Sequence, residues 1–142
     1  MGTTPKHSVS VAGIVVRDDD RVLVIRRDDT GHWEAPGGVL ELAESFEDGV
    51  RREVLEETGL TVEVERLTGV YKNLTHGIVA LVYRCHPADG ETHPTAEACE
   101  VRWMAREEVQ SAMSPAFAVR VMDAFEDWPQ SRAHDGINIV KA

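Results

Sequence analysis

Runs of β-branched and aliphatic residues open the chain. Ser8–Val16 and Val22–Arg26 are two such runs, and the five charged residues between them, Arg17–Arg21, are typical of a turn. This pattern predicts two antiparallel strands that form a hairpin at the start of the fold. Arg27–Gly38 follows and is dense in turn residues, so we expect a loop that leads the chain into a helix.

The spacing of the apolar residues changes to a helical period near Ser45. Val50 and Val54 are four residues apart and define the apolar stripe of a helix at Phe46–Thr58. Ser45 is a suitable N-cap residue, and Gly59 is a suitable residue to end the helix. Both ends of this helix are therefore predicted from local signals.

Further strands and two more helices are predicted after this helix. The strands are Val62–Leu67, Gly69–Lys72, Gly77–Cys85 and Val101–Met104, and the helices are Arg106–Ala112 and Pro115–Trp128. The tail, Pro129–Ala142, is polar apart from a short apolar alternation at Ile137–Val140. Because strands and helices do not alternate strictly, the pattern predicts an α+β fold with a mixed sheet packed between helices.

Length and composition indicate one soluble domain. A chain of 142 residues, 42% of them hydrophobic, suits a single core, so residues 1–142 are assigned to one domain. The longest apolar run, Ile78–Tyr83, is far shorter than a membrane-spanning helix, and no signal-peptide pattern precedes it. Cys85 and Cys99 are too few for a disulfide scaffold and suit a reducing compartment. We therefore expect a cytoplasmic protein with no membrane partner.

The chain is acidic, with 25 Asp and Glu against 15 Lys and Arg and a net charge of −10. Neutralising a nucleic acid backbone needs clustered basic side chains, so no nucleic acid partner is expected. A phosphorylated substrate would instead need divalent cations held by clustered acids.

Three glutamates of the predicted helix form such a cluster. At ~100° per residue, Glu57 falls inside the apolar stripe, and Glu53 and Glu56 fall at its margin. Carboxylates this close repel one another, and a buried charge without a partner costs several kcal/mol, so a positive group is expected among them. The alternative is a solvated acidic face that Arg51 and Arg52 balance.

The residues around this cluster form a longer motif. From Gly38 the chain reads Gly38, five residues, Glu44, seven residues, Arg52-Glu53-Val54, one residue, Glu56-Glu57, one residue and Gly59-Leu60. This is the Nudix box, G-x5-E-x7-R-E-U-x-E-E-x-G-U with U an aliphatic residue, at every specified position. At average residue usage a chance match anywhere in this chain is on the order of 10⁻⁷. The chain therefore resembles the Nudix hydrolases.

The resemblance implies a Nudix α/β/α sandwich, with the mixed sheet between helices. It also implies a pyrophosphohydrolase that cleaves a nucleoside diphosphate linked to another moiety by attack of activated water on phosphorus. Mg²⁺ is the expected cofactor and Mn²⁺ its expected substitute. The implied partner is a small-molecule nucleotide, and both a monomer and a homodimer are compatible with the sequence.

The metal ligands that the resemblance implies are the three glutamates of the cluster, Glu53, Glu56 and Glu57, together with the carbonyl oxygen of Gly37. All are hard oxygen donors, which Mg²⁺ prefers. Gly38 has no side chain and leaves the backbone open to the ion. Glu53 is the preferred general base for the attacking water, and Glu56 is its principal rival.

A further ligand often comes from outside the box. Glu97 is preferred, and Glu100 is the alternative, because Glu100 stands where a strand begins and can pair with Arg102. Within the box, Arg52 is interpreted as a structural residue that pairs with Glu44 and holds the loop on the helix.

The residues that contact the nucleotide are less determined. Trp33 is the preferred aromatic residue to stack on a base, ahead of Tyr71, Tyr83 and Trp103, each of which also suits the core. Arg26 is a candidate phosphate ligand together with Arg27. Asn73–His76 is interpreted as a hairpin turn, with a substrate loop as the alternative.

Marks of particular Nudix subfamilies are absent. Thr75 and His76 stand where ADP-ribose pyrophosphatases commonly have Pro, and Gly77 stands where dinucleoside polyphosphate hydrolases have Tyr. A (deoxy)nucleoside triphosphate is therefore the preferred substrate, with those two classes as alternatives. A non-catalytic, nucleotide-sensing Nudix domain is the alternative of another kind, although it would be expected to lose box acids and none is lost.

Overall fold

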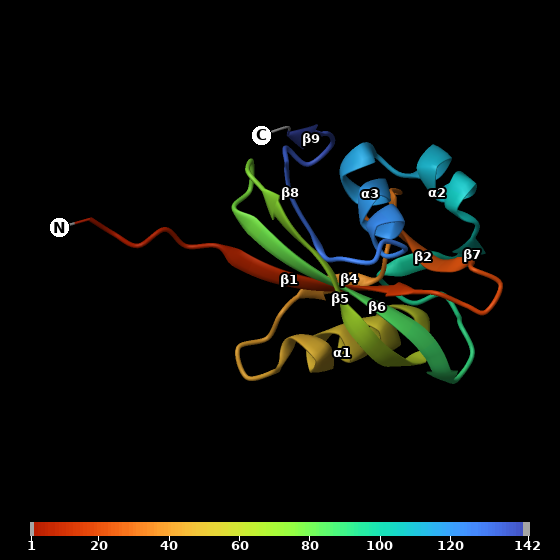
Figure 1. The fold of residues 1–142 in the computed structure, drawn as a ribbon. Helices are drawn as coiled ribbons and strands as arrows, with labels where there is room; N and C mark the ends of the chain where they lie inside the picture. The colour runs from red at the N-terminus through yellow and green to blue at the C-terminus, as the bar shows by residue number, and fades with distance from the viewer. Residues whose placement is uncertain (1, 141–142) are drawn as a thin grey trace.

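The computed structural model describes residues 2–140 and arranges them in three layers, with sheets between α1 on one side and α2 and α3 on the other (Figure 1). The helices are α1 (Phe46–Thr58), α2 (Arg106–Ala112) and α3 (Pro115–Asp123). The strands are β1 (Ser8–Val15), β2 (Val22–Arg27), β3 (Trp33–Glu34), β4 (Gly37–Val39), β5 (Thr61–Asn73), β6 (Ile78–Asp89), β7 (Ala98–Met104), β8 (Gln130–His134) and β9 (Ile139–Val140). Met1, Lys141 and Ala142, at the ends of the predicted domain, lie outside the described residues.

The strands form two sheets. The larger has the order β4-β1-β6-β5-β8-β9, in which β1 and β6 are parallel, β5 and β8 are parallel, and the other neighbours are antiparallel. The smaller has the order β3-β2-β7 and is antiparallel throughout. A mixed sheet packed between helices is the predicted α+β sandwich, which the structure confirms.

The core has two halves, one on each side of the larger sheet. Along β1, Val11 and Val15 belong to the half that contains Val50 and Val54 of α1, whereas Ala12 and Ile14 belong to the half covered by α3. Side chains of a strand alternate between its faces, so a strand buried on both faces is apolar throughout. This explains the continuous apolar run at the start of the chain.

The predicted hairpin between the first two strands is wrong. β1 and β2 lie in different sheets, and within residues 2–140 their ends meet in a single isolated antiparallel bridge, that of Val16 with Val22. Both edges of β1 are occupied, one by β4 and the other by β6. The tight turn at Arg17–Arg21 is present, and the Arg17 N–H donates to the Arg21 carbonyl to close it. This turn connects a strand of one sheet to a strand of the other.

Other predicted boundaries also change. The expected loop Arg27–Gly38 contains β3 and β4. Two predicted strands, Val62–Leu67 and Gly69–Lys72, form the single strand β5. Its pairing with β6 shifts register between Leu67 and Gly69, where the two predicted strands meet. The last helix ends at Asp123 and not at Trp128.

The tail holds a strand that the pattern did not indicate. β8 has the polar sequence QSRAH and pairs in parallel with β5, so its position depends on backbone hydrogen bonds to a distant segment. The apolar alternation at Ile137–Val140 overlaps β9. No helix within residues 2–140 is long and apolar enough to cross a membrane.

Candidate active site

The central helix α1 forms as predicted, with both caps in place. Ser45 Oγ accepts from the Asp48 N–H at 3.1 Å, and Gly59 adopts a left-handed conformation with φ of 82° while its N–H donates to the Leu55 carbonyl. The helix lies close against β1 because Gly13 has no side chain: a Cβ there would be 3.0 Å from Val54. This close approach brings the glutamates of α1 to the edge strand β4.

Glu53 and Glu57 meet the backbone of β4 at adjacent residues. The Gly37 N–H donates to Glu57 Oε1 at 2.7 Å. A Cβ at Gly38 would lie 2.7 Å from the carboxyl carbon and both carboxyl oxygens of Glu53, so position 38 has no room for a side chain. The requirement for glycine here is a consequence of where the Glu53 carboxylate lies.

Burial separates the three glutamates. Glu57 is 2% exposed and Glu53 is 8% exposed, whereas Glu56 is exposed. Burial, opposed by the Gly37 N–H, raises the pKa of Glu57 to about 8, and burial also raises the pKa of Glu53. Glu57 lies inside the apolar stripe as predicted. Glu53, predicted at its margin, is buried as well, because β4 covers that side of the helix.

Arg52 connects the cluster to the loop before α1. Its Nε and Nη2 donate to the two carboxyl oxygens of Glu44, at 2.9 and 2.6 Å. This bidentate pair is the one expected from the sequence, and it holds the pKa of Glu44 down at about 2. Nη1 also donates to Glu53 Oε1 at 2.8 Å and to Glu56 Oε2 at 3.3 Å, so Arg52 balances part of the acidic face, as the alternative interpretation has it. Arg52 is thus the positive group among the acids.

The acidic cluster fits a divalent cation by its chemistry. Across residues 2–140 no group of three or more His, Cys, Asp or Glu side chains is gathered around a common point as a ready-made metal site. Arg52 instead contacts two of the carboxylates, those of Glu53 and Glu56. The donors present are carboxylate and backbone oxygens, the ligands that Mg²⁺ takes. Two buried carboxylates that lie against the backbone of adjacent glycines form a donor set suited to such an ion.

The two acids outside the box lie in different surroundings. Glu97 is exposed in the loop before β7, and its charge contributes to raising the pKa of both Glu53 and Glu57. Glu100 instead accepts from Arg26 and from Arg102, each at 2.9 Å, and these contacts lower its pKa. The preference for Glu97 over Glu100 as a further ligand stays a prediction.

Of the residues expected to bind substrate, Arg26 and Trp33 do not line the cavity beside Gly37, whereas Arg27 does. Arg26 pairs with Glu100, and its Nε also donates to the Gly31 carbonyl at 3.3 Å. Trp33 packs against the core, with the Arg102 guanidinium 4.8 Å from its ring centre. Their roles stay predictions.

A cavity of about 280 Å³ opens next to Gly37 and Gly38. It is lined by Arg27 and Glu34 from the segment before the box and, from later segments, by Asn73, Phe117, Arg120 and His134. Asn73 belongs to a turn as interpreted, since its Oδ1 accepts from the N–H groups of Thr75 and His76. Apart from Asn73, the later residues carried no signal in the sequence, because topology alone brings β8 and α3 to this place.

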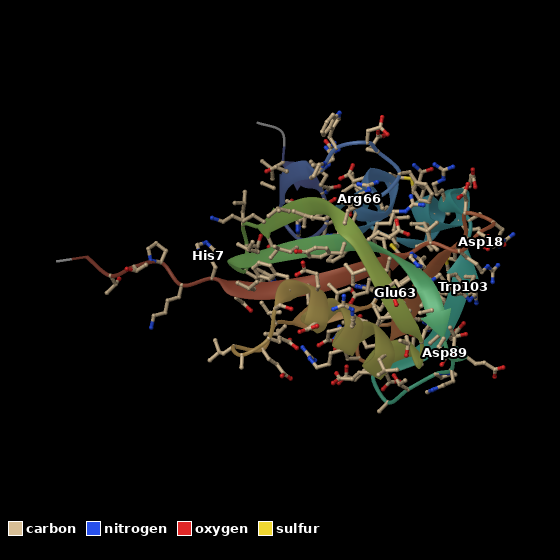
Figure 2. The ribbon with its side chains drawn as sticks, turned by 60° about the horizontal axis from the view of Figure 1, so that its bottom comes forward. His7, Asp18, Glu63, Arg66, Asp89 and Trp103 are labelled. Carbon is tan, nitrogen blue, oxygen red and sulfur yellow. The ribbon has the colours of Figure 1, made fainter. Side chains whose placement is uncertain are left out.

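A second hollow of about 640 Å³ lies elsewhere, lined by residues that include Asp18 and Trp103. Figure 2 shows both residues at the end of the molecule away from His7. The box glutamates line neither hollow. The cavity beside Gly37 adjoins the acidic cluster because Gly37 and Gly38 line it and contact Glu57 and Glu53.

Comparison with known sequences extends over most of the chain. A family model described as NUDIX domain matches residues 6–125. A MutT-like protein of Streptomyces ambofaciens is 55% identical over 139 residues, which cover 97% of this chain and 90% of the relative. An ADP-ribose pyrophosphatase of Methanocaldococcus jannaschii is 40% identical over 68 residues, which cover 46% of this chain and only 40% of that relative. A putative 8-oxo-dGTP diphosphatase of Bacillus subtilis is 37% identical over 59 residues, or 42% of this chain and 40% of the relative.

Solved structures show the same architecture. A NUDIX hydrolase from Nitrosomonas europaea superimposes with a TM-score of 0.78 at 23% identity, over 93% of this chain and 82% of that one. An ADP-ribose pyrophosphatase from Streptococcus suis does so with a TM-score of 0.76 at 20% identity, over 91% of this chain and 100% of that one. At these identities the likeness concerns the fold alone.

Proposed function

The chain belongs to the Nudix family, and from this we propose that it hydrolyses a (deoxy)nucleoside triphosphate to the monophosphate and pyrophosphate. As a member of this family, the chain is a hydrolase that acts on phosphoric anhydride bonds and uses a divalent metal. The observation that carries the proposal is the packing of Glu53 and Glu57 against Gly37 and Gly38, with all box acids retained. The putative 8-oxo-dGTP diphosphatase of Bacillus subtilis, which matches 42% of this chain, supports a triphosphate substrate.

We assign Mg²⁺, with Mn²⁺ as a substitute, to Glu53, Glu56, Glu57, the Gly37 carbonyl and Glu97. When bound, the ion supplies polarisation of a phosphoryl oxygen and favours deprotonation of the attacking water. Beyond this, the chain's own residues set the site. Arg52 ties the loop to α1 through Glu44 and holds Glu53 in place.

Glu53 is the proposed general base. Its carboxylate is 8% exposed, lies at the open backbone of Gly38, and has a raised pKa that brings it closer to the operating pH. Glu56 is the rival base, since it is exposed and its contact with Arg52, at 3.3 Å, is longer than that of Glu53 at 2.8 Å. Glu53→Gln is expected to lose most of kcat while nucleotide binding stays, and Glu97→Gln to lose less.

The experiment is hydrolysis by the purified chain of a panel that includes the common nucleoside triphosphates, ADP-ribose and a dinucleoside polyphosphate. Phosphate is measured after addition of pyrophosphatase or phosphatase, with Mg²⁺, with Mn²⁺ and with EDTA. We expect triphosphates to be the preferred substrates and EDTA to abolish turnover. Undiminished turnover in EDTA contradicts the metal assignment.

Two other outcomes overturn the substrate assignment. A preference for ADP-ribose or for the dinucleoside polyphosphate moves the chain to that class. Binding of nucleotides without any turnover identifies a nucleotide-sensing domain.

A further inference from the structure

The cavity beside the box is lined by an arginine whose buried Nε lacks an acceptor. Arg120 of α3 lines this cavity with its guanidinium 4.7 Å from the ring centre of Phe117 and 5.0 Å from that of Tyr71. Its Nε is buried and has no hydrogen-bond partner within residues 2–140. Leaving a buried donor of a charged group unsatisfied is costly, so such a group in a cavity indicates a ligand that accepts from it.

His134 of β8 does not supply the missing acceptor. Its Nδ1 accepts from the Gly136 N–H at 3.0 Å. Burial, together with the positive charge of Arg120, holds the pKa of His134 below its usual value, so the ring is neutral near pH 7. A neutral imidazole that accepts at Nδ1 carries its proton at Nε2. Nε2 lies 3.3 Å from Arg120 Nη2, so two donors face each other there.

Asn73 adds a third donor to the same cavity. Its Oδ1 already accepts from the N–H groups of Thr75 and His76, at 3.0 and 3.1 Å. The remaining polar group of the side chain is the amide NH₂, which only donates. Three side chains from β5, α3 and β8 therefore bring donors to one cavity.

The rest of the cavity suits a flat ring better than a phosphate. At about 280 Å³ it lies at the small end of ligand pockets, and much of its lining is apolar, including Ala12, Ile78 and Phe117. Two further charged side chains that line it, Arg27 and Glu34, are already paired with each other at 3.2 Å, so Arg27 is not free for a phosphate. Gly37 and Gly38, which contact the box glutamates, form one side of the cavity. A nucleobase in the cavity would therefore place the phosphates of the same nucleotide next to those glutamates.

We propose that this cavity holds the nucleobase and that Arg120, with His134 and Asn73, reads a ring keto oxygen. The proposal rests on the proposed function for the identity of the ligand as a nucleotide. The planar fork of an arginine matches O6 and N7 of guanine, whereas adenine and cytosine present an amino group at the corresponding edge and would set donor against donor. Guanine is therefore preferred over adenine, and uracil over cytosine.

The test separates recognition of the base from hydrolysis. The full chain is titrated calorimetrically in EDTA with the 5′-monophosphates of guanosine, adenosine, uridine and cytidine. Each keto base is expected to bind at least about tenfold more tightly than its amino counterpart, which corresponds to ~1.4 kcal/mol. Absence of this preference in the unaltered chain, including absence of binding by all four, overturns the inference whatever the hydrolysis assay shows. Loss of hydrolysis with the preference intact contradicts only the proposed function.

Variants then assign the preference to Arg120. Arg120→Met is expected to reduce each ratio to within about twofold without lowering the melting temperature. Methionine keeps an apolar side chain against Phe117 and Tyr71 and removes the buried Nε donor that lacks an acceptor. Arg106→Met is the matched control, since Arg106 also lies over an aromatic ring, 4.2 Å from that of Phe125, but is exposed and outside the cavity. The control is expected to keep both ratios.

Arg120→Lys distinguishes a keto oxygen from a phosphate as the ligand of Arg120. Lysine serves a phosphate as a point charge but lacks the planar fork. We expect Arg120→Lys to lose the preference as Arg120→Met does. If Arg120→Met weakens all four monophosphates equally and Arg120→Lys restores them, Arg120 binds phosphate and the inference is wrong.

Discussion

Adjacent glutamates of α1 have very different surroundings. Glu57 is 2% exposed and accepts from the Gly37 N–H, whereas Glu56 is exposed and reaches Arg52. One step along a helix rotates a side chain by ~100°, which here moves it from the sheet to the solvent. The pKa of Glu57, raised to about 8 mainly by burial, shows that the metal-free fold disfavours the charge at this position.

Glu57→Gln is therefore expected to keep or raise the melting temperature of the metal-free protein, because the amide oxygen still accepts from Gly37 and the buried charge is gone. It is expected to lower kcat about a hundredfold or more, equivalent to ~2.7 kcal/mol of transition-state stabilisation. Calorimetric melting with and without Mg²⁺ and steady-state kinetics measure both effects. Glu63→Gln, at an exposed position of β5, is the control (Figure 2). Retained turnover and retained stabilisation by Mg²⁺ would show that Glu57 is not a ligand.

The two cysteines also differ in burial. Cys85 is buried and Cys99 is exposed, and burial raises the pKa of the Cys85 thiol to about 12. Since the thiolate is the reactive form, the native protein is expected to react with one equivalent of a thiol reagent at pH 8 and with two in denaturant. Cys99→Ser should abolish the native reaction. Two rapid equivalents in the native state would contradict the packing of β6.

At the scale of elements, Arg52 joins α1 to the loop that precedes it. Its contacts with Glu44 are bidentate, and one further donor reaches the Val39 carbonyl at 3.3 Å. Glu44 Oε1 in turn accepts from the Glu41 N–H at 2.9 Å. The loop is thus held to the helix by one side chain.

Arg52→Ala is expected to lower the melting temperature and to weaken metal binding about 10–100-fold, the usual effect of losing a group that orients ligands. Arg51→Ala is the matched control, because Arg51 pairs with the exposed Asp48 and surface pairs contribute little. Melting curves and Mn²⁺ titration measure the two effects. Loss of activity at an unchanged melting temperature would mean that Arg52 contacts substrate.

At the scale of the whole molecule, Asp123 fastens α3 to the larger sheet. It is 3% exposed, accepts from the Tyr71 hydroxyl of β5 at 2.8 Å, and takes two bonds from Arg132 of β8 at 2.8 and 2.9 Å. These bonds also position the wall of the cavity that contains Arg120.

Asp123→Ala is expected to lower the free energy of unfolding by about 2–3 kcal/mol, because it leaves a buried hydroxyl and a half-buried guanidinium without their acceptor. Urea denaturation measures this loss. Asp127→Ala, at an exposed position soon after α3, is expected to change stability by less than about 0.5 kcal/mol. Equal effects of the two changes would show that the buried bonds contribute no stability.

The sequence by itself determined those features that depend on nearby residues. The bounds of α1 are confirmed at Phe46–Thr58 because a cap on each side and a helical apolar period act within a few residues. The box at Gly38–Leu60 identified the family for the same reason, since most of its residues lie on one helix and the loop before it. The pairing of Arg52 with Glu44 was also within reach of this local pattern.

Only the tertiary structure decided which segments become neighbours. Whether β1 pairs with β2 or with β4 and β6 depends on hydrogen bonds between strands far apart in the chain, which no local pattern contains. The polar strand β8 exists because β5 offers it an edge. Arg120 and His134 meet at the cavity because α3 and β8 both pack on β5 near the box. Their burial there then removes the water that would otherwise accept from their donors.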